Sequence, residues 1–226
     1  MDAPLFETMD RFDQDMAPLL FMEHMRVAFE LDQEQQAGQP KSFGISYLRM
    51  LRGWLFDANR PEGAVMKGWA ESRFGLRPLF HKEPINSLND DAYYIYLMEK
   101  MSPRFNNNAI FSQFDILYEY CQYFLERFAP VKGKKILYRA INLQNDDARI
   151  IKRLSKRDWI VRNNCLTSYS ACRERASEFG DVVLEVEVPY QKIFCCPEIL
   201  PGTFPTYEHE AIVLGGDFLS KKIDVF

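Results

Sequence analysis

The sequence is poor in the residues that bind metal ions. It has only three histidines, His24, His81 and His209, and none stands in a His-Glu-x-x-His or comparable spacing. Its five cysteines contain no Cys-x-x-Cys pattern. We therefore expect no structural or catalytic metal site. The odd number of cysteines, which includes the adjacent pair Cys195 and Cys196, predicts reduced thiols rather than disulfide bonds.

Common nucleotide-binding and hydrolase motifs are also absent. No Gly-x-Gly-x-x-Gly follows a predicted strand, and Gly133-Lys134-Lys135 lacks the earlier glycine and the Ser or Thr of a P-loop. No Gly-x-Ser-x-Gly marks a hydrolase nucleophile. If the chain handles a dinucleotide, some other set of residues must hold it.

Long hydrophobic runs and an excess of positive charge are missing too. No run approaches the ~18 apolar residues that a membrane span requires. Met1 is followed by acidic residues rather than by a basic and then apolar leader, which predicts a cytoplasmic protein without a secretory signal. With a net charge of −4 and no basic stripe, the chain offers no surface for nucleic acid.

The first part of the chain has the periodicity of helices. Apolar residues recur at helical spacing in five segments, residues 16–31, 45–56, 62–74, 90–101 and 109–128. The third segment has the clearest ends, with Pro61 and Glu62 at its start and Gly75 just past its last turn. We expect residues 1–132 to form a mainly helical lobe.

From residue 133 the pattern changes to short segments typical of strands. Strands are predicted at residues 135–143, 159–161, 166–169, 181–188 and 191–195, and from Glu208 onward. Short helices are predicted between them at residues 146–154 and 172–179. Few helices among many short strands favour a mixed or antiparallel sheet. We expect an α+β fold in one domain, residues 1–226, with its β-rich core over residues 133–226.

Two glutamates open the last predicted strand. Side chains two residues apart leave the same face of a strand, so Glu208 and Glu210 should point into one space while His209 points away. Adjacent carboxylates repel each other, and a fold keeps them together mainly when a cation or a chemical task uses both. The alternative is a solvated strand edge, because Glu-x-Glu also occurs by chance, as at Glu185 and Glu187.

A stiff loop precedes these glutamates. Residues 197–205 contain three prolines and a glycine, which exclude a regular element. Phe204 and Tyr207 stand at its end, close to the glutamates. We interpret the loop as a recognition lip beside a site, the alternative being a plain connection.

An arginine, a serine and the glutamate pair follow one another at the predicted strands. Arg139 lies within the first, Thr167 and Ser168 open another, and Glu208-x-Glu210 opens the last. This order resembles the Arg, Ser, Glu-x-Glu pattern of arginine-specific mono-ADP-ribosyltransferases.

Four longer segments resemble one branch of that superfamily, the dinitrogenase-reductase ADP-ribosyltransferases of nitrogen-fixing bacteria. They are residues 47–54, 62–76, 173–181 and 215–217, and the likeness spans about residues 20–218. The superfamily's Ser-Thr-Ser stands here as Leu166-Thr167-Ser168, so Ser170 is an alternative to Ser168 as the motif serine.

The resemblance implies a chemical role for each motif residue. Glu210 would stabilise the oxocarbenium-like ribose formed when NAD loses nicotinamide. Glu208 would orient the acceptor guanidinium and take its proton. Ser168, with Thr167 beside it, would hold the ribose and the Glu210 carboxylate. Arg139 would bind the NAD pyrophosphate, whereas an ordinary surface ion pair is its simpler explanation.

The resemblance also implies partners. NAD would be the substrate, nitrogenase iron protein the acceptor whose modification switches nitrogen fixation off, and a PII-type signalling protein the regulator. Phe204 and Tyr207 would contact the acceptor, and Arg52, Lys67 and Arg73 are further candidates for partner contacts. Two alternatives stay open: an arginine transferase with another target, and a non-enzymatic binding module.

Overall fold

The N-terminal part of the protein is helical, as predicted. The computed structural model describes residues 3–31, 45–143, 149–203 and 209–223. Its α-helices in this part are α1 (Ala3–Met9), α2 (Ala17–Ala28), α3 (Tyr47–Phe56), α4 (Pro61–Phe74), α5 (Asp91–Lys100) and α6 (Ile110–Phe128). All five predicted helices are present. Two features were not predicted, α1 and a small antiparallel pair, β1 (Phe80–His81) with β2 (Glu83–Pro84). No helix in the described ranges is long and apolar enough to cross a bilayer.

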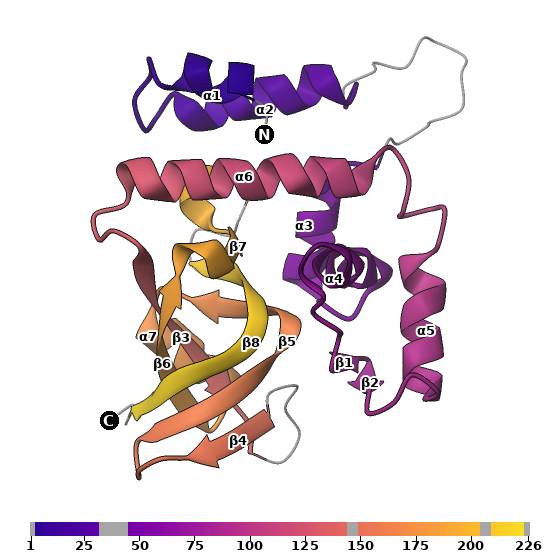
Figure 1. The fold of residues 1–226 in the computed structure, drawn as a ribbon, viewed down its shortest axis with the longest axis vertical. Helices are drawn as coiled ribbons and strands as arrows, with labels where there is room; N and C mark the ends of the chain where they lie inside the picture. The colour runs from indigo at the N-terminus through magenta and orange to yellow at the C-terminus, as the bar shows by residue number, and fades with distance from the viewer. Residues whose placement is uncertain (1–2, 32–44, 144–148, 204–208, 224–226) are drawn as a thin grey trace.

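Helix α6 runs across the molecule between two layers (Figure 1). α1 and α2 cover one side of it, and the sheet and α3 to α5 lie on the other. Phe21 of α2 stacks on Tyr120 of α6, with 4.1 Å between the ring centroids. Facing the sheet, Gln122 donates a 2.8 Å hydrogen bond to the carbonyl of Ile193. One hydrophobic core therefore joins the helical part to the sheet through α6.

The C-terminal part forms an antiparallel sheet with strand order β4-β5-β3-β6-β8-β7. Its strands are β3 (Lys134–Ile141), β4 (Arg149–Arg153), β5 (Asp158–Ser170), β6 (Val182–Pro189), β7 (Ile193–Cys195) and β8 (Glu210–Ile223). β8 pairs with both β5 and β6, so β3, β6, β8 and β5 form a closed ring of pairings. The predicted α+β class with an antiparallel sheet is confirmed.

Strand β8 bends where two glycines face an irregularity in β5. The β5–β8 register shifts between Asn163 and Leu166, opposite Gly215 and Gly216. A Cβ atom on Gly215 would lie 2.0 Å from the carbonyl oxygen of Asn164, and Gly216 has φ 131°. Only glycine fits this close approach and this backbone conformation. The bend lets β8 follow β5 and still reach β6 at its far end.

The predicted helix at residues 146–154 is wrong. Arg149–Arg153 form the edge strand β4, paired with the first half of β5, and residues 144–148 lie outside the described residues. Ile150 packs against the core from this strand. The β-branched pair Ile150 and Ile151 and the neighbouring strand override the helical charge pattern, because tertiary pairing outweighs weak local propensity.

Three other boundaries differ from the prediction. The strands predicted at residues 159–161 and 166–169 are one strand, β5, because both parts pair with β8 on either side of an irregularity. The strand predicted at 191–195 is shortened by the 3-10 turn Tyr190–Lys192. The loop predicted at 197–205 begins with one 3-10 turn, Pro197–Ile199. The helix predicted at 172–179 is present as α7 (Arg173–Ala176) followed by the 3-10 turn Ser177–Phe179.

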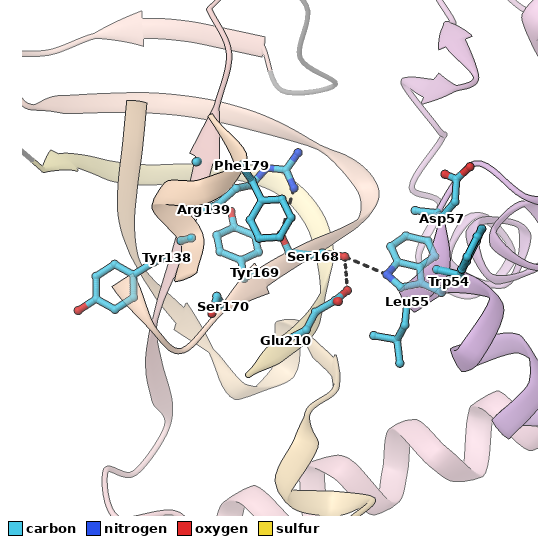
Figure 2. Close-up of a pocket in the computed structure, with 14 residues that line it drawn as sticks. Trp54, Leu55, Asp57, Tyr138, Arg139, Ser168, Tyr169, Ser170, Phe179 and Glu210 are labelled. Atoms are coloured by element: carbon cyan, nitrogen blue, oxygen red, sulfur yellow. Dashed lines mark hydrogen bonds between the residues drawn. The ribbon is translucent and has the colours of Figure 1, made fainter. Parts of the chain in front are cut away.

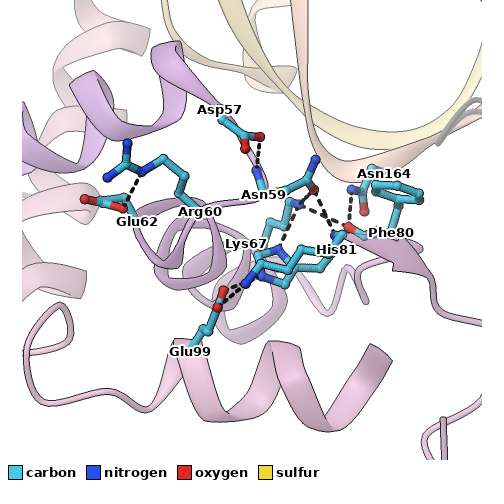
Figure 3. A network of polar contacts seen from close by, with 10 residues as sticks. Asp57, Asn59, Arg60, Glu62, Lys67, Phe80, His81, Glu99 and Asn164 are labelled. Carbon is cyan, nitrogen blue, oxygen red and sulfur yellow. Dashed lines mark hydrogen bonds and ion pairs between the residues drawn. The ribbon is translucent and has the colours of Figure 1, made fainter. Parts of the chain in front are cut away.

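A buried polar network fastens β1 to α4 and α5 (Figure 3). Lys67, only 1% exposed, donates to Asn59 Oδ1 at 3.2 Å and to the carbonyl of Phe80 at 3.0 Å. It also lies 3.3 Å from His81 Nδ1, while His81 Nε2 lies 2.8 Å from Glu99 Oε2. Lys67 is therefore part of the interior. It cannot contact a partner protein, although the sequence analysis had kept it as a candidate.

Histidine 81 is uncharged in this network. Burial, and then the Lys67 charge, lower the pKa of His81 to about 4, although Glu99 opposes them. Lys67 can only donate, so His81 Nδ1 accepts and His81 Nε2 donates to the Glu99 carboxylate.

Stability should fall as His81 is forced to take a proton. Its pKa is lower in the folded chain than the usual 6.5, so the unfolded chain binds more protons between these values. The free energy of unfolding should decrease from pH 6.5 toward pH 4, by up to roughly 3 kcal/mol from this residue. His81→Gln should flatten that decrease in urea denaturation, whereas His209→Gln, at an exposed residue, should not. An equal slope in both variants would contradict the assignment.

Candidate active site

A cavity of about 330 Å³ opens between the end of α3 and strands β3, β5 and β8 (Figure 2). Its polar lining residues include Arg139, Ser168, Ser170 and Glu210. Its aromatic lining residues are Trp54, Phe56, Tyr138, Tyr169 and Phe179. Flat apolar surfaces beside a few converging polar groups are typical of small-molecule sites.

Serine 168 and glutamate 210 meet across the β5–β8 pairing. The Ser168 hydroxyl donates to Glu210 Oε1 at 2.5 Å. Glu210 is the first residue of β8, and its backbone pairs with Ser170 at the end of β5. Glu210 is half-buried and bonded, so it is not the solvated strand edge of the alternative interpretation.

Arginine 139 reaches the same place from β3. Its Nη1 donates to the carbonyl oxygen of Ser168 at 3.0 Å. β3 meets β5 at the pair Tyr138 and Ser170, which brings Arg139 beside the serine strand. Burial, and then Glu185, raise the pKa of the neighbouring Tyr138, which keeps its phenol uncharged. The structure therefore brings together Arg139, Ser168 and Glu210 from three different strands.

The structure separates the other hydroxyl candidates from this cluster. Thr167 is buried, does not line the cavity, and donates to the carbonyl of Asn164 at 3.3 Å. Alternation along β5 turns its side chain away from that of Ser168. Ser170 lines the cavity, and its hydroxyl accepts a 3.1 Å hydrogen bond from Cys172 N. The Ser168 hydroxyl donates to the Glu210 carboxylate, which favours Ser168 as the motif serine.

We predicted that Glu208 and Glu210 share one face of a strand, but the strand β8 begins only at Glu210. His209 has φ 47°, a left-handed conformation outside strand geometry, and is exposed. Its carbonyl accepts a 3.0 Å hydrogen bond from Ala171 N, which closes the chain over the end of β5. Glu208, Phe204 and Tyr207 lie outside the described residues. Their predicted roles stay predictions.

Tryptophan 54 belongs to the site, although we predicted no role for it from the sequence. Its Nε1 donates to the Ser168 hydroxyl oxygen at 2.9 Å. Helix α3 starts at Ser46, whose side chain accepts from Arg49 N at 3.2 Å, and Trp54 lies on its buried face. Trp54 ends one of the segments that carried the family resemblance, residues 47–54, but that likeness could not show that the ring faces a serine 114 residues later.

Phenylalanine 179 also lines the cavity and was not singled out. Its ring is 62% exposed, and the Arg175 guanidinium lies 5.3 Å from the ring centroid. It stands in the 3-10 turn after α7, inside one of the segments that carried the family resemblance. Similarity of a segment to a family can draw attention to such a residue. It cannot show whether the aromatic ring contacts a ligand or only lies on the surface.

Two basic residues of the helical lobe have different surroundings. Arg73 makes two 2.8 Å hydrogen bonds to Asp115, which raise the pKa of its guanidinium and tie α4 to α6. Arg52 is exposed on α3. Arg52 therefore remains a candidate for a partner contact, whereas the guanidinium of Arg73 is already bonded within the protein.

An arginine, a serine and a glutamate around one cavity form the arrangement expected of an ADP-ribosyltransferase. The chain belongs to the dinitrogenase reductase ADP-ribosyltransferase family, whose model matches residues 1–222. It is 43% identical over 229 residues to the NAD(+)–dinitrogen-reductase ADP-D-ribosyltransferase of Rhodospirillum rubrum, an alignment covering 98% of this chain and 83% of that protein. No solved structure matched the chain. The family expected from the sequence is confirmed.

Replacing Arg139 should weaken NAD binding without unfolding the protein. Loss of a charge-assisted hydrogen bond to the pyrophosphate predicts a rise in Kd of about 10- to 100-fold for Arg139→Ala. Arg139→Lys should restore little, because an ammonium cannot reproduce the planar fork. Calorimetric titration with NAD measures both. Arg162→Ala is the matched control, since Arg162 pairs with Asp217 and does not line the cavity. Unchanged affinity in Arg139→Ala would refute the assignment.

Proposed function

We propose that this chain transfers ADP-ribose from NAD to an arginine of dinitrogenase reductase and so switches nitrogen fixation off. The main observation is the Ser168–Glu210 hydrogen bond in the cavity, with Arg139 beside it. The relative from Rhodospirillum rubrum is named as an ADP-ribosyltransferase of dinitrogen reductase, which supports the choice of acceptor.

The cavity residues suit the parts of NAD. A guanidinium carries five N–H donors, so Arg139 can bond Ser168 O and still bind an anionic pyrophosphate. The ring of Phe179, which lines the cavity and is 62% exposed, offers a flat face against which nicotinamide can stack. The cavity thus provides one cation for the phosphates and aromatic surface for the leaving group.

Glutamate 210 serves the bond-breaking step. The bond between nicotinamide and the ribose breaks, its electron pair leaves with neutral nicotinamide, and positive charge develops on the ribose. A carboxylate bonded to a ribose hydroxyl stabilises that charge most strongly in the transition state. Glu210 has one oxygen held by Ser168, which fixes the direction of the carboxylate.

The acceptor guanidinium then attacks the ribose carbon. A guanidinium has a pKa above ~12, so it needs a base to orient it and take its proton as the new bond forms. We assign this role to Glu208, two residues before Glu210. Water would replace the guanidinium in a slow hydrolysis of NAD.

Regulation and compartment belong to the same proposal. The family resemblance supports a PII-type signalling protein as the regulatory partner and the cytoplasm as the place of action.

Incubation with labelled NAD and purified dinitrogenase reductase tests whether the chain transfers ADP-ribose to that acceptor. Label on an arginine of the acceptor is the expected result, and its absence with active acceptor would refute it.

The two glutamates should lose different activities when changed. Glu210→Gln removes the charge that faces the developing cation, so transfer and NAD hydrolysis should both fall by about 10² or more. Glu208→Gln keeps that charge and should abolish transfer while hydrolysis persists. Glu187→Gln is the control, because Glu187 is an exposed residue of β6 that pairs with Lys134 of β3. Parallel loss of both activities in the two variants would argue against this division of roles.

The aromatic residues near Glu208 should affect acceptor recognition more than NAD chemistry. Truncating the preceding loop would damage the core, because Ile199 and Leu200 are fully buried. Phe204→Ala and Tyr207→Ala should instead lower modification of dinitrogenase reductase by about 10-fold or more, the scale of an interface anchor, with NAD hydrolysis unchanged. Leu219→Ala, at an exposed leucine of β8, is the control. Equal loss of both activities would assign the aromatics a structural role.

A further inference from the structure

We propose that Trp54 is a positioning residue for the transfer reaction, acting on Glu210 through Ser168. This inference rests on the proposed roles of Ser168 and Glu210. Two bonds carry it: Trp54 Nε1 to Ser168 Oγ at 2.9 Å, and Ser168 Oγ to Glu210 Oε1 at 2.5 Å (Figure 2).

The direction of this relay follows from the donors each group has. An indole N–H can only donate, so the Ser168 oxygen must accept from Trp54. A serine hydroxyl has one proton, and a carboxylate can only accept, so that proton goes to Glu210. A hydroxyl that accepts one bond also becomes a stronger donor in the next. Trp54 therefore both orients and strengthens the bond that holds Glu210.

Trp54 is itself held firmly. Its side chain is 3% exposed on the buried face of α3. Behind it, α3 packs so closely on α4 that a Cβ atom on Gly53 would lie 2.5 Å from Glu62. The Lys67 ammonium, fixed in the buried network, lies 5.9 Å from the centroid of the Trp54 ring. The donor thus has a fixed direction before any substrate arrives.

Glutamate 210 needs such a constraint because of its place in the chain. It is the first residue of β8, and His209 before it already leaves strand geometry. A long side chain at a strand end has several rotamers of similar energy. Without Trp54 the Ser168 hydroxyl can rotate toward other acceptors, which weakens the bond by which it orients the Glu210 carboxylate.

The test removes the indole N–H in two ways. Trp54→Phe is the simple variant, and replacement by benzothienylalanine keeps the size and shape of the indole but has sulfur in place of N–H. Both should lower kcat by about 10-fold for NAD hydrolysis and for transfer, the scale of one lost buried hydrogen bond. The KM for NAD should stay within about 2-fold, because Trp54 acts on the carboxylate that serves the transition state.

Trp159→Phe is the matched control. Trp159 is 5% exposed at the start of β5, and among the described residues its Nε1 has no hydrogen-bond partner. This change removes the same atoms from a buried site without breaking a relay. Its kcat should equal that of the unchanged protein. The melting temperature of each variant shows whether folding is affected. Replacement of Trp54 by benzothienylalanine should leave the melting temperature unchanged.

A double-mutant cycle with Ser168→Ala decides between positioning and packing. If Trp54 acts through Ser168, Trp54→Phe should have no further effect on kcat in the Ser168→Ala background. The inference would be overturned if Trp54→Phe lowered kcat equally with Ser168 present and in Ser168→Ala. It would also be overturned if benzothienylalanine at position 54 left kcat unchanged. An unchanged kcat in Ser168→Ala alone would overturn the proposed role of Ser168 as well. The Ser168→Ala variant therefore distinguishes an error in the proposed site from an error in the role of Trp54.

Discussion

The antiparallel pairing of β5 with β8 is the constraint on which the candidate site depends. It runs from Asp158 and Lys221 at one end to Ser170 and Glu210 at the other. The glycines at positions 215 and 216 allow the close approach and the bend in its middle. Because the last pair sets the backbone of Glu210 beside β5, the carboxylate comes within reach of Ser168. A register slip of one residue would turn the glutamate to the other face of the sheet.

The helical lobe does more than cover this sheet. Helix α6 joins the core of the lobe to β7, and α3 brings Trp54 to the serine of β5. Burying a charged lysine is costly unless its donors are satisfied, and Lys67 meets three acceptors at once. That network holds α4 rigid just behind α3. The candidate site is therefore assembled from both parts of the chain, and the lobe supplies the indole N–H that bonds Ser168.

Sequence reasoning was most successful where a physical pattern is local. The five helices from Ala17 to Phe128 follow from apolar spacing and from end signals such as Pro61 and Gly75. It failed at Arg149–Arg153, where a neighbouring strand decided the conformation, and at residues 159–169, where pairing with β8 joins two predicted strands into one. In both places the deciding partner is distant in the sequence, so no local pattern could reveal it.

The sequence by itself determined the α+β class, the family, and the identity of Arg139, Ser168 and Glu210 as candidates. These follow from composition, periodicity and ordered motifs, which are properties of the chain alone. Only the tertiary structure showed that the Ser168 hydroxyl bonds Glu210, that Thr167 bonds the carbonyl of Asn164 instead, and that Lys67 lies in the interior. It alone brought Trp54 to Ser168, because a hydrogen bond between residues 114 positions apart depends on how helices and sheet pack.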